Sequence, residues 1–293
     1  DWLDAELVES DWRPVSLRTG VCVGDRVSFD DGTETAVDVS DPPARADAPD
    51  ETGSVDDDPT PNADETVDET TITAALVAET VTAGGQCLAF VRSRAEAARL
   101  AEQLAADDLA KQMGIEKAAS SAADAVSDVD GTVTGRTLAG CVRSGVAFHH
   151  AGLRSGHRAA VERAFRDRKI ACLCATPTLA AGVNVPARRV VVRDQRRYTG
   201  SSMEWLPTLE VHQMCGRAGR PGLDPHGEAI LVGEPSSRET LVDRYVDGEP
   251  EAVESTLTAP ASLRTHVLSG VATGFAATEA EILDVFEGTF YAR

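Results

Sequence analysis

The sequence predicts an α/β fold in which a parallel β-sheet is flanked by helices. Short apolar segments bounded by turn residues alternate with longer segments of helical periodicity, and this alternation is typical of parallel sheets. The chain has 293 residues, of which 42% are hydrophobic, so it contains enough apolar material for a substantial core. It has no run of 18 apolar residues, and we therefore predict no contact with a membrane.

The first 70 residues divide into three predicted parts. Residues 1–20 carry a short apolar pattern, and residues 21–37 predict a β-hairpin because apolar residues alternate ahead of an Asp31-Gly32 turn. Residues 38–70 combine 12 acidic residues and five prolines with almost no large apolar side chain. We expect this stretch to be a disordered acidic linker, with an acidic mimic of nucleic acid as the alternative.

From residue 72 onward, helical and strand patterns alternate. Strands are expected over residues 86–91, 146–148, 170–175, 189–193 and 229–232. Helices are expected over residues 72–83, 93–106, 132–143 and 155–168, with a looser helical insertion over 107–130. A capping box from Ser93 to Glu96 begins the second helix. Ligands of such folds lie at the carboxyl ends of the strands, where we expect the motifs described below.

After residue 257 the alternation of strand and helix patterns gives way to helical patterns alone. A helix is expected over residues 260–273, and a second capping box, from Thr278 to Glu281, begins another helix. We expect residues 258–293 to be the beginning of a small helical domain that is cut short.

Charge is distributed unevenly along the chain. The formal charge is −20, but residues 143–220 hold 14 basic and 5 acidic residues, a net of +9. A basic segment inside an acidic protein is the local pattern that a polyanion site requires. Arginine outnumbers lysine 25 to 3, which together with abundant Asp and Glu is typical of a cytoplasm with very high salt. Phosphate contacts at high salt depend on short, bidentate arginine bonds.

The six cysteines contain no C-x-x-C pair. Cys172 and Cys174 would face the same side of one strand, so we predict core thiols in a reducing cytoplasm. A zinc site built from His149, His150 and His157 lacks a nearby thiolate or carboxylate partner. We therefore predict no metal site of this kind.

The strongest motif is HQMCGRAGRPG, residues 212–222. The glycines allow a tight backbone turn, so Arg217 and Arg220 are expected to project together toward a phosphate chain. An arginine presented to a γ-phosphate stabilises the charge of the transition state. The alternative is a surface turn with two solvated arginines, and the full Q-x-x-G-R-x-G-R pattern favours the phosphate interpretation.

A second motif, ATPTLAAGVNVPA, occupies residues 175–187 directly after a predicted strand. Thr176 and Thr178 offer hydroxyl groups at an expected helix start, an arrangement that binds anions. Gly182 would permit a close backbone approach. Without other motifs, the two threonines would indicate only a helix cap.

Two shorter blocks also follow predicted strands. FHHAGL, residues 148–153, is expected to contact a phosphate backbone through three residues, His150, Ala151 and Gly152. FVRSR, residues 90–94, predicts a basic turn that includes Arg92. A Walker A loop is absent from the sequence, because the three lysines follow Ala, Glu and Arg rather than Gly. Two acidic pairs within residues 64–69 follow no apolar strand, so we do not interpret them as a Walker B box.

In this order and spacing, the four blocks resemble motifs IV, IVa, V and VI of the second RecA-like motor domain of superfamily 2 helicases. The Ala-Ala-Gly-Val-Asn-Val-Pro-Ala form of motif V resembles the Ski-type branch, and the flanks resemble archaeal Ski-type DNA repair helicases. The resemblance implies that residues 1–20 end a first motor domain, residues 71–257 form the second, and residues 258–293 begin a winged-helix domain.

The resemblance also implies residue roles. Arg217 and Arg220 would be arginine fingers facing ATP and Mg²⁺ held mainly by a first motor domain, with Gln213 and Gly182 near the same nucleotide. The tracking strand's phosphates would be held by Arg92, His150 and Thr176 with the adjoining loop. Residues 193–205 fall where these helicases carry a strand-separating hairpin, whose basic and aromatic residues are Arg196, Arg197, Tyr198 and Trp205. For Trp205, core packing is an equally good interpretation.

Motifs I, II and III are missing from this sequence. We therefore expect a monomeric portion of a 3′–5′ DNA helicase that binds single-stranded or forked DNA but needs a first RecA-like domain as partner to hydrolyse ATP. A non-catalytic nucleic-acid-binding lobe, or a decayed helicase fragment, is the alternative from another class. An RNA substrate is a third possibility, because contacts to the backbone carry little sequence or sugar information.

Overall fold

The computed structural model describes residues 6, 8, 10, 12–40, 67–180 and 184–292. The chain divides into two compact units, residues 13–250 and residues 251–293 with 1–12. The expected acidic linker lies mostly outside the described residues, which omit 41–66, and Gly182 also lies outside them. Among the helices that the structure describes, none combines the length and apolar character needed to span a bilayer.

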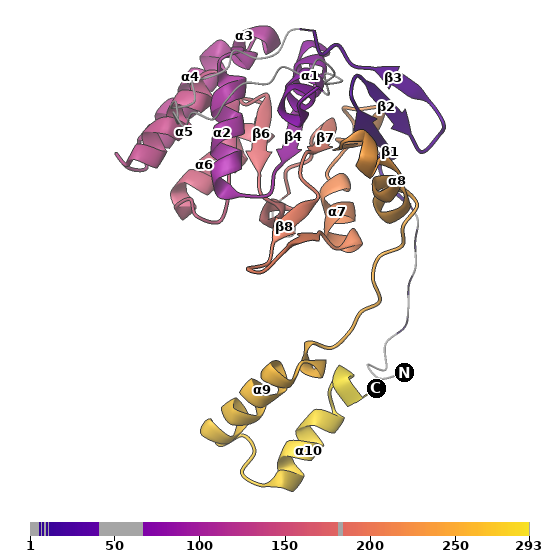
Figure 1. Ribbon diagram of the computed structural model, residues 1–293. Coiled ribbons are helices and arrows are strands. Elements are labelled where there is room, and N and C mark those ends of the chain that lie inside the picture. The colour runs from indigo at the N-terminus through magenta and orange to yellow at the C-terminus, as the bar shows by residue number, and fades with distance from the viewer. Residues whose placement is uncertain are drawn as a thin grey trace, which may run out of the picture. The chain divides into compact units, whose positions relative to one another are not determined.

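An eight-stranded mixed sheet forms the centre of the larger unit, in the order β3-β2-β1-β10-β7-β4-β6-β5 (Figure 1). The six strands from β1 to β5 in this order run parallel, and β2 and β3 add an antiparallel edge. The strands are β1 (Ser16–Val23), β2 (Arg26–Phe29), β3 (Glu34–Ala36), β4 (Cys87–Phe90), β5 (Val146–His149), β6 (Cys172–Ala175), β7 (Arg189–Val192) and β10 (His226–Val232). The predicted α/β class is confirmed.

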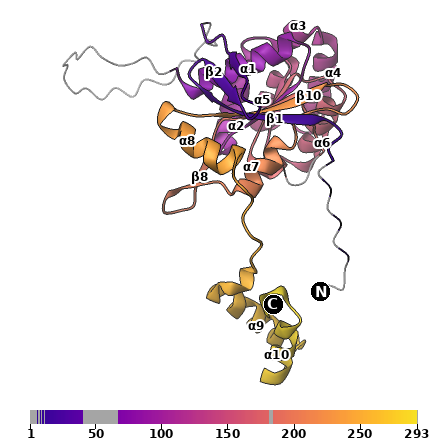
Figure 2. The same cartoon turned by 90° about the vertical axis from the view of Figure 1, so that its right-hand side faces the viewer.

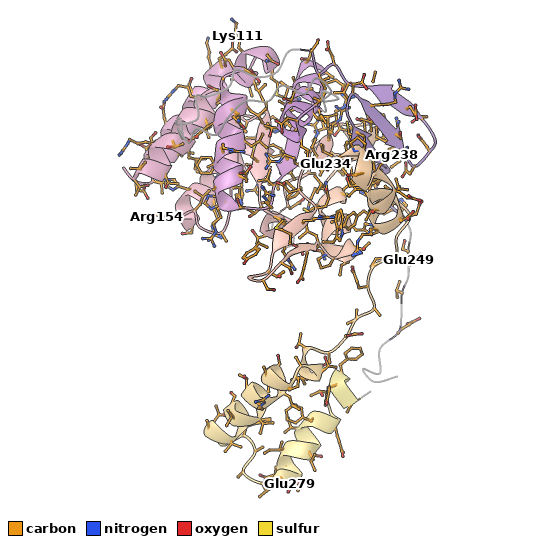
Figure 3. All side chains as sticks on the ribbon, in the orientation of Figure 1. Lys111, Arg154, Glu234, Arg238, Glu249 and Glu279 are labelled. Atoms are coloured by element: carbon orange, nitrogen blue, oxygen red, sulfur yellow. The ribbon has the colours of Figure 1, made fainter. Side chains whose placement is uncertain are left out.

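Helices flank the sheet (Figures 1 and 2). They are α1 (Glu69–Thr82), α2 (Arg94–Ala105), α3 (Leu109–Met113), α4 (Glu116–Ser127), α5 (Val133–Arg143), α6 (Ser155–Arg166), α7 (Thr208–Cys215) and α8 (Arg238–Leu241). Helices α2, α5 and α6 contact β5, whereas α1 and α7 contact β7 and β10. Lys111 of α3 and Arg154, just before α6, point away from this unit (Figure 3).

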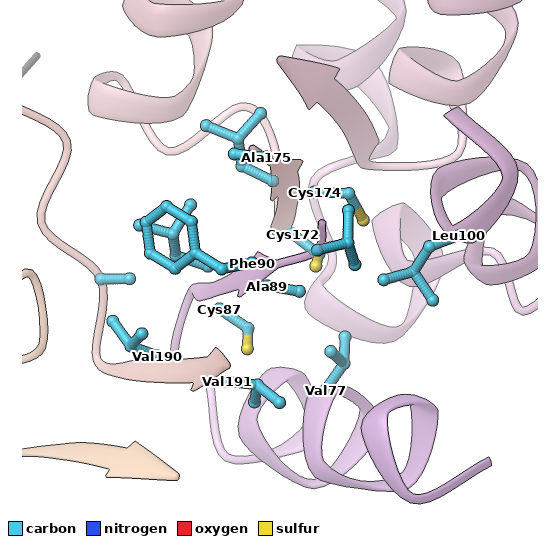
Figure 4. Close-up of a cluster of buried hydrophobic side chains, with 14 of the residues drawn as sticks. Val77, Cys87, Ala89, Phe90, Leu100, Cys172, Cys174, Ala175, Val190 and Val191 are labelled. Atoms are coloured by element: carbon cyan, nitrogen blue, oxygen red, sulfur yellow. The ribbon is translucent and has the colours of Figure 1, made fainter. Parts of the chain in front are cut away.

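Buried thiols and aliphatic side chains pack together in the core between the sheet and helices α1 and α2. Cys87, Cys172 and Cys174 lie on the same face, next to Val77 of α1 and Leu100 of α2 (Figure 4). Hydrogen bonds with the two neighbouring thiols and burial all raise the pKa of Cys172, so this thiol stays protonated. The six cysteines are all buried and free, which confirms the prediction of core thiols.

The N-terminal boundary differs from the prediction. Residues 16–23, divided in the prediction between the end of a first motor domain and a hairpin, form the single strand β1, which pairs in parallel with β10. The chain then turns at Gly24, and the expected Asp31-Gly32 turn joins β2 to β3. The first four residues of β1, Ser16 to Thr19, are exposed or half-buried, so this part of the strand lacks the continuous apolar run by which the other parallel strands are recognised.

The predicted loose insertion over residues 107–130 is also wrong in detail. It forms two helices, α3 and α4, and α4 packs against α5 and α6 and buries Ala119, Ala122, Ala123 and Val126. Small side chains allow the two helices to approach closely, but they give a weak apolar signal in the sequence.

The two predicted capping boxes differ in completeness. Ser93 accepts a hydrogen bond from the Glu96 amide at 3.1 Å, but the Glu96 carboxylate binds Arg193 instead of returning to the cap. In the smaller unit, the box between Thr278 and Glu281 is complete and begins α10 (Glu279–Glu287). Helix α9 (Pro260–Ala272) matches its predicted range closely.

Gly227 at the beginning of β10 has no room for a side chain. A Cβ atom there would lie 2.4 Å from the backbone of Ala218 and of Gly219. We expect Gly227→Ala to lower the free energy of unfolding by about 1–3 kcal/mol or more, because main-chain atoms cannot move aside. Urea unfolding of the chain checks this. Gly140→Ala on the exposed face of α5, where a Cβ meets nothing within 4 Å, is the matched control. An equal loss in both variants would contradict the prediction.

Candidate functional site

The loops that follow β4, β6 and β7 meet at the carboxyl edge of the sheet with the loop after β5. They surround a hollow of about 550 Å³, which we call the basic hollow. Its charged and small polar lining includes Arg92, Arg94, Thr176, Thr178, Arg196 and Arg197. The lining contains one carboxylate, Glu210, which is already paired with Arg197 at 2.9 Å. Four guanidinium groups around one open hollow create a local site for an anion.

The structure brings together five of the nine predicted nucleic-acid residues at the basic hollow. These are Arg92, Ala151, Thr176, Arg196 and Arg197. Trp205 lines an adjoining hollow of about 390 Å³ that shares Arg92 and Arg196. His150, Gly152 and Tyr198 line neither hollow. The sequence analysis does not predict a role for Arg94, although its place in the basic FVRSR turn is a usable signal.

His150 is buried beside the basic hollow and stacks on Phe148. Its Nδ1 atom accepts a hydrogen bond from the Gly152 amide at 3.1 Å, which leaves the proton on Nε2. Burial, then the charge of Arg94, lower the pKa of His150 below its ordinary value. The ring is therefore neutral at pH 7 and offers a hydrogen-bond donor rather than a charge.

The Thr176 region corrects one expectation. A single 3₁₀ turn, Pro177–Leu179, follows β6, and the Thr176 side chain makes no capping bond. The hydroxyl groups of Thr176 and Thr178 instead lie 3.0 Å apart. In the described residues the predicted helix start is therefore a single 3₁₀ turn with Thr176 at its N-cap position, and hydroxyl groups and arginines supply the polar lining.

A buried ion-pair network lies behind the basic hollow. Arg193 donates to Glu96 of α2 at 2.6 Å and to Asp194 at 2.9 Å, and only 5% of its side chain is exposed. Asp194 also accepts the backbone amide of Arg92 at 3.0 Å. Burial alone would raise the pKa of Glu96, but the hydrogen bond and charge of Arg193 hold it below its ordinary value. The network fixes the position of the Arg92 loop.

Residues 193–205 form the hairpin that the resemblance implied. Strands β8 (Arg196–Tyr198) and β9 (Met203–Trp205) pair antiparallel, and Tyr198 is 67% exposed. The Trp205 ring packs partly against the core, and the Arg196 guanidinium lies 3.9 Å from its centroid. Trp205 is therefore partly packed in the core, one of the two interpretations that the sequence left open, and the other, a stacking contact with nucleic acid, stays a prediction.

The motif VI turn lies away from this edge, contrary to the expectation that all motifs gather at carboxyl ends. Gly219 packs against Gly227 at the amino end of β10, and Arg220 contacts Gln86 ahead of β4. The reason is topological, because this motif precedes its strand whereas the other motifs follow theirs. A backbone pairing between Ala187 and Ala218 ties the turn to the end of motif V.

Arg217 and Arg220 do not project together. Arg217 is half-buried and donates to the carbonyl of Ala180, and its buried Nε atom has no hydrogen-bond partner among the residues that the structure describes. Arg220 is 7% exposed and makes a bidentate ion pair with Asp224, with both distances 2.7 Å. Its Nη1 atom also donates to Gln86 at 3.1 Å. Of these two arginines, only Arg217 has a buried donor atom without a partner in the described part of the chain.

The remaining predicted residues are placed as follows. Gln213 is exposed on α7, ahead of the turn. His149 binds Glu162 at 2.9 Å, and His157 lies 3.7 Å from Asp130. Within the described part of the chain, no three His, Cys, Asp or Glu side chains gather in a way that could hold a metal ion.

The chain is similar in sequence to known proteins. Residues 132–222 match the helicase conserved C-terminal domain. Over 99% of its length the chain is 37% identical to the ATP-dependent DNA helicase Hel308 of Methanocella arvoryzae, of which it covers 36%. It is 40% identical to the protein of the same name from Pyrobaculum calidifontis, with 98% of this chain and 37% of that protein covered. The corresponding protein of Thermoplasma volcanium is 35% identical, with 99% and 37% covered.

The mostly parallel sheet flanked by helices is consistent with a RecA-like helicase C-terminal domain, the kind of domain that residues 132–222 match. Along nearly its whole length, the chain is similar to archaeal ATP-dependent DNA helicases. It spans slightly more than a third of the length of these relatives.

Proposed function

We propose that the chain is the C-terminal motor portion of an ATP-dependent 3′–5′ DNA helicase of the Ski-type branch. The observation that carries the proposal is the basic hollow, where four arginines and two threonine hydroxyl groups line one opening at the carboxyl edge of the sheet. Guanidinium and hydroxyl donors in such a groove suit the phosphate backbone of a single strand. The names of the relatives support DNA as the substrate.

The motif VI turn supports an ATP-facing role for Arg217. Its buried, unpartnered Nε atom is a donor that a phosphate oxygen could satisfy. We propose that Arg217 faces ATP, with Mg²⁺ and most of the nucleotide held by a first RecA-like domain, and with Gln213 and Gly182 beside it. Arg220 could reach a nucleotide only if its ion pair with Asp224 opened. We therefore propose that Arg220 stabilises the conformation of the turn.

Binding of single-stranded DNA tests the basic hollow directly. We expect Arg92→Ala to weaken binding of a fluorescent oligothymidine and to lower the slope of log affinity against log salt by about 1. Arg143→Ala removes the same charge from exposed α5 and is the matched control. Fluorescence anisotropy across a salt series measures both variants. Equal slopes for Arg92→Ala and the unaltered chain would contradict the assignment.

The same assay separates DNA from RNA. Competition between DNA and RNA strands of matched sequence is expected to favour DNA if the relatives' substrate applies to this chain. A preference for RNA would overturn the DNA assignment while leaving the helicase assignment in place.

Reconstitution distinguishes a motor portion from an accessory lobe. We expect no ATP hydrolysis by this chain alone, and DNA-stimulated hydrolysis after a first RecA-like domain is added. Binding of DNA without restored hydrolysis would favour the non-catalytic lobe. On the same resemblance we propose that residues 258–293 begin a winged-helix domain, that the enzyme repairs DNA as a monomer, and that its arginine-rich, acidic composition reflects a haloarchaeal host.

A further inference from the structure

A π-helical turn, Val242–Val246, lies beside the segment that joins the hairpin to α7. Such turns are rare and occur frequently at functional sites. Tyr245 in this turn is 1% exposed and is among the largest fully buried side chains among the described residues. None of the motifs accounts for its burial at this position.

Tyr245 contacts both the hairpin and α7. Its hydroxyl donates to the carbonyl of Leu206 at 2.8 Å, directly after β9. Its ring packs edge-to-face on Trp205, with centroids 6.3 Å apart. Its backbone carbonyl accepts a hydrogen bond from Nε2 of His212 on α7 at 2.9 Å. The buried Tyr245 is therefore hydrogen-bonded both to Leu206, at the base of the β8–β9 hairpin, and to His212 of α7, the helix that leads into motif VI.

Neighbouring contacts strengthen the same link. Thr208 at the beginning of α7 donates to the carbonyl of Arg244 at 3.2 Å, and the Arg244 guanidinium lies 5.8 Å from the Trp205 centroid. Leu206 is tied to Gln195 at the other side of the hairpin by a backbone bond of 2.8 Å. The π-helical turn is thus hydrogen-bonded to Leu206 at the end of the hairpin and to Thr208 at the beginning of α7.

Helix α7 ends at Cys215, two residues before Arg217. A helix moves as a rigid element on the scale of one or two turns, so a displacement of the motif VI turn must carry His212 with it. His212 is bonded to Tyr245, and Tyr245 is bonded to the base of the hairpin. This gives a continuous path of packed and hydrogen-bonded groups between the two sites.

We propose that Tyr245 is a positioning residue that couples the motif VI turn to the hairpin. It transmits displacement of Arg217 during the nucleotide cycle to the strands that meet the duplex. The inference rests on the proposed helicase function, because it assigns the hairpin a part in separating strands.

The test uses the complete helicase that contains this chain. In Tyr245→Phe, the ring and its packing remain while the bond to Leu206 is lost. We expect unwinding of a forked duplex to slow about fivefold, the factor that corresponds to one hydrogen bond, while hydrolysis of ATP stimulated by single-stranded DNA stays unchanged. Tyr291→Phe in the smaller unit, where the side chain is 43% exposed, is the matched control.

A second pair of variants examines the other bond. His212→Ala removes the donor to Tyr245 and is expected to slow unwinding in the same selective way. His212→Gln keeps an N–H group at a similar position and is expected to restore the rate. Thermal unfolding of every variant checks that the fold is kept.

The outcomes separate the two proposals. A parallel fall in hydrolysis and unwinding, or no change in either, would overturn the coupling role and leave the helicase function in place. An unaltered enzyme that shows no DNA-stimulated hydrolysis would overturn the proposed function, and the coupling role with it.

Discussion

Arg217→Ala is expected to abolish ATP hydrolysis in an enzyme reconstituted with a first RecA-like domain, while ATP binding is retained. An arginine that stabilises charge on the transferred phosphoryl group contributes on the order of 10³–10⁵ in rate, and it acts mainly in the transition state. The first domain would hold most of the nucleotide, so the loss should appear in kcat. Steady-state hydrolysis and binding of a fluorescent ATP analogue measure the two properties separately.

The structure gives this prediction a control within the same motif. Gln213→Ala changes an exposed side chain two residues before the end of α7 and removes no positive charge. We expect a smaller loss of hydrolysis than in Arg217→Ala. Normal turnover in the Arg217 variant would exclude its role at the phosphate and leave its contact with Ala180 as a local feature of the turn.

Arg220→Ala is expected to act first on stability. The variant leaves the Asp224 carboxylate, whose side chain is 3% exposed, buried without its cation. Removing one partner of a buried ion pair costs about 3–5 kcal/mol, a large part of the stability of a domain. Urea unfolding of this chain, without ATP or a partner domain, measures the effect. A loss below about 1 kcal/mol would indicate that the pair is effectively solvated.

The double variant Arg220→Met with Asp224→Leu separates the cost of an unpaired charge from that of lost packing. Apolar side chains of similar volume in place of both partners are expected to recover most of the stability. If the double variant still binds DNA but does not support hydrolysis after reconstitution, Arg220 also has a part in the chemistry.

The pH dependence of the Arg220 variant follows from the same ion pair. Burial alone would raise the pKa of Asp224, but the hydrogen bonds and charge of Arg220 hold it below its ordinary value of 3.8. The stabilisation is therefore present above about pH 4 and is lost as the pH falls through the lowered pKa. We expect the difference in unfolding free energy between the unaltered chain and Arg220→Ala to shrink as the pH falls, first where Asp224 of the variant takes up a proton above its ordinary pKa of 3.8 and then through the lowered pKa of the unaltered chain. A difference that stays constant down to pH 2 would contradict this linkage.

Most of the sheet was predictable because its signal is local. Strands such as β6 and β7 are buried on both faces, so each is a short, continuous apolar run between turn residues. The motifs that follow strands were predictable in position for the same reason. Parallel strands bring their carboxyl ends to one edge, and Arg92, Thr176 and Arg196 do meet there.

Long-range pairings were not predictable from one sequence. Nothing near Arg193 indicates that it binds Glu96, which lies 97 residues earlier, or that Asp194 fixes the amide of Arg92. Helix α4 was underestimated because alanine packs well without raising the apolar signal. In each case the deciding contact joins groups that only the tertiary fold brings within hydrogen-bonding or packing distance.

The sequence by itself determined the α/β class and the order of most elements, because these depend on local periodicity. Phosphate contacts by the four motifs remain a prediction from side-chain chemistry. The tertiary structure alone decided how the two arginines of this motif are bonded. Arg217 and Arg220 are equivalent in the sequence, but Arg220 is buried in an ion pair with Asp224, whereas Arg217 keeps a buried Nε atom without a partner among the described residues. The physical reason is that burial makes an unpaired charge costly, and burial is a property of the folded chain.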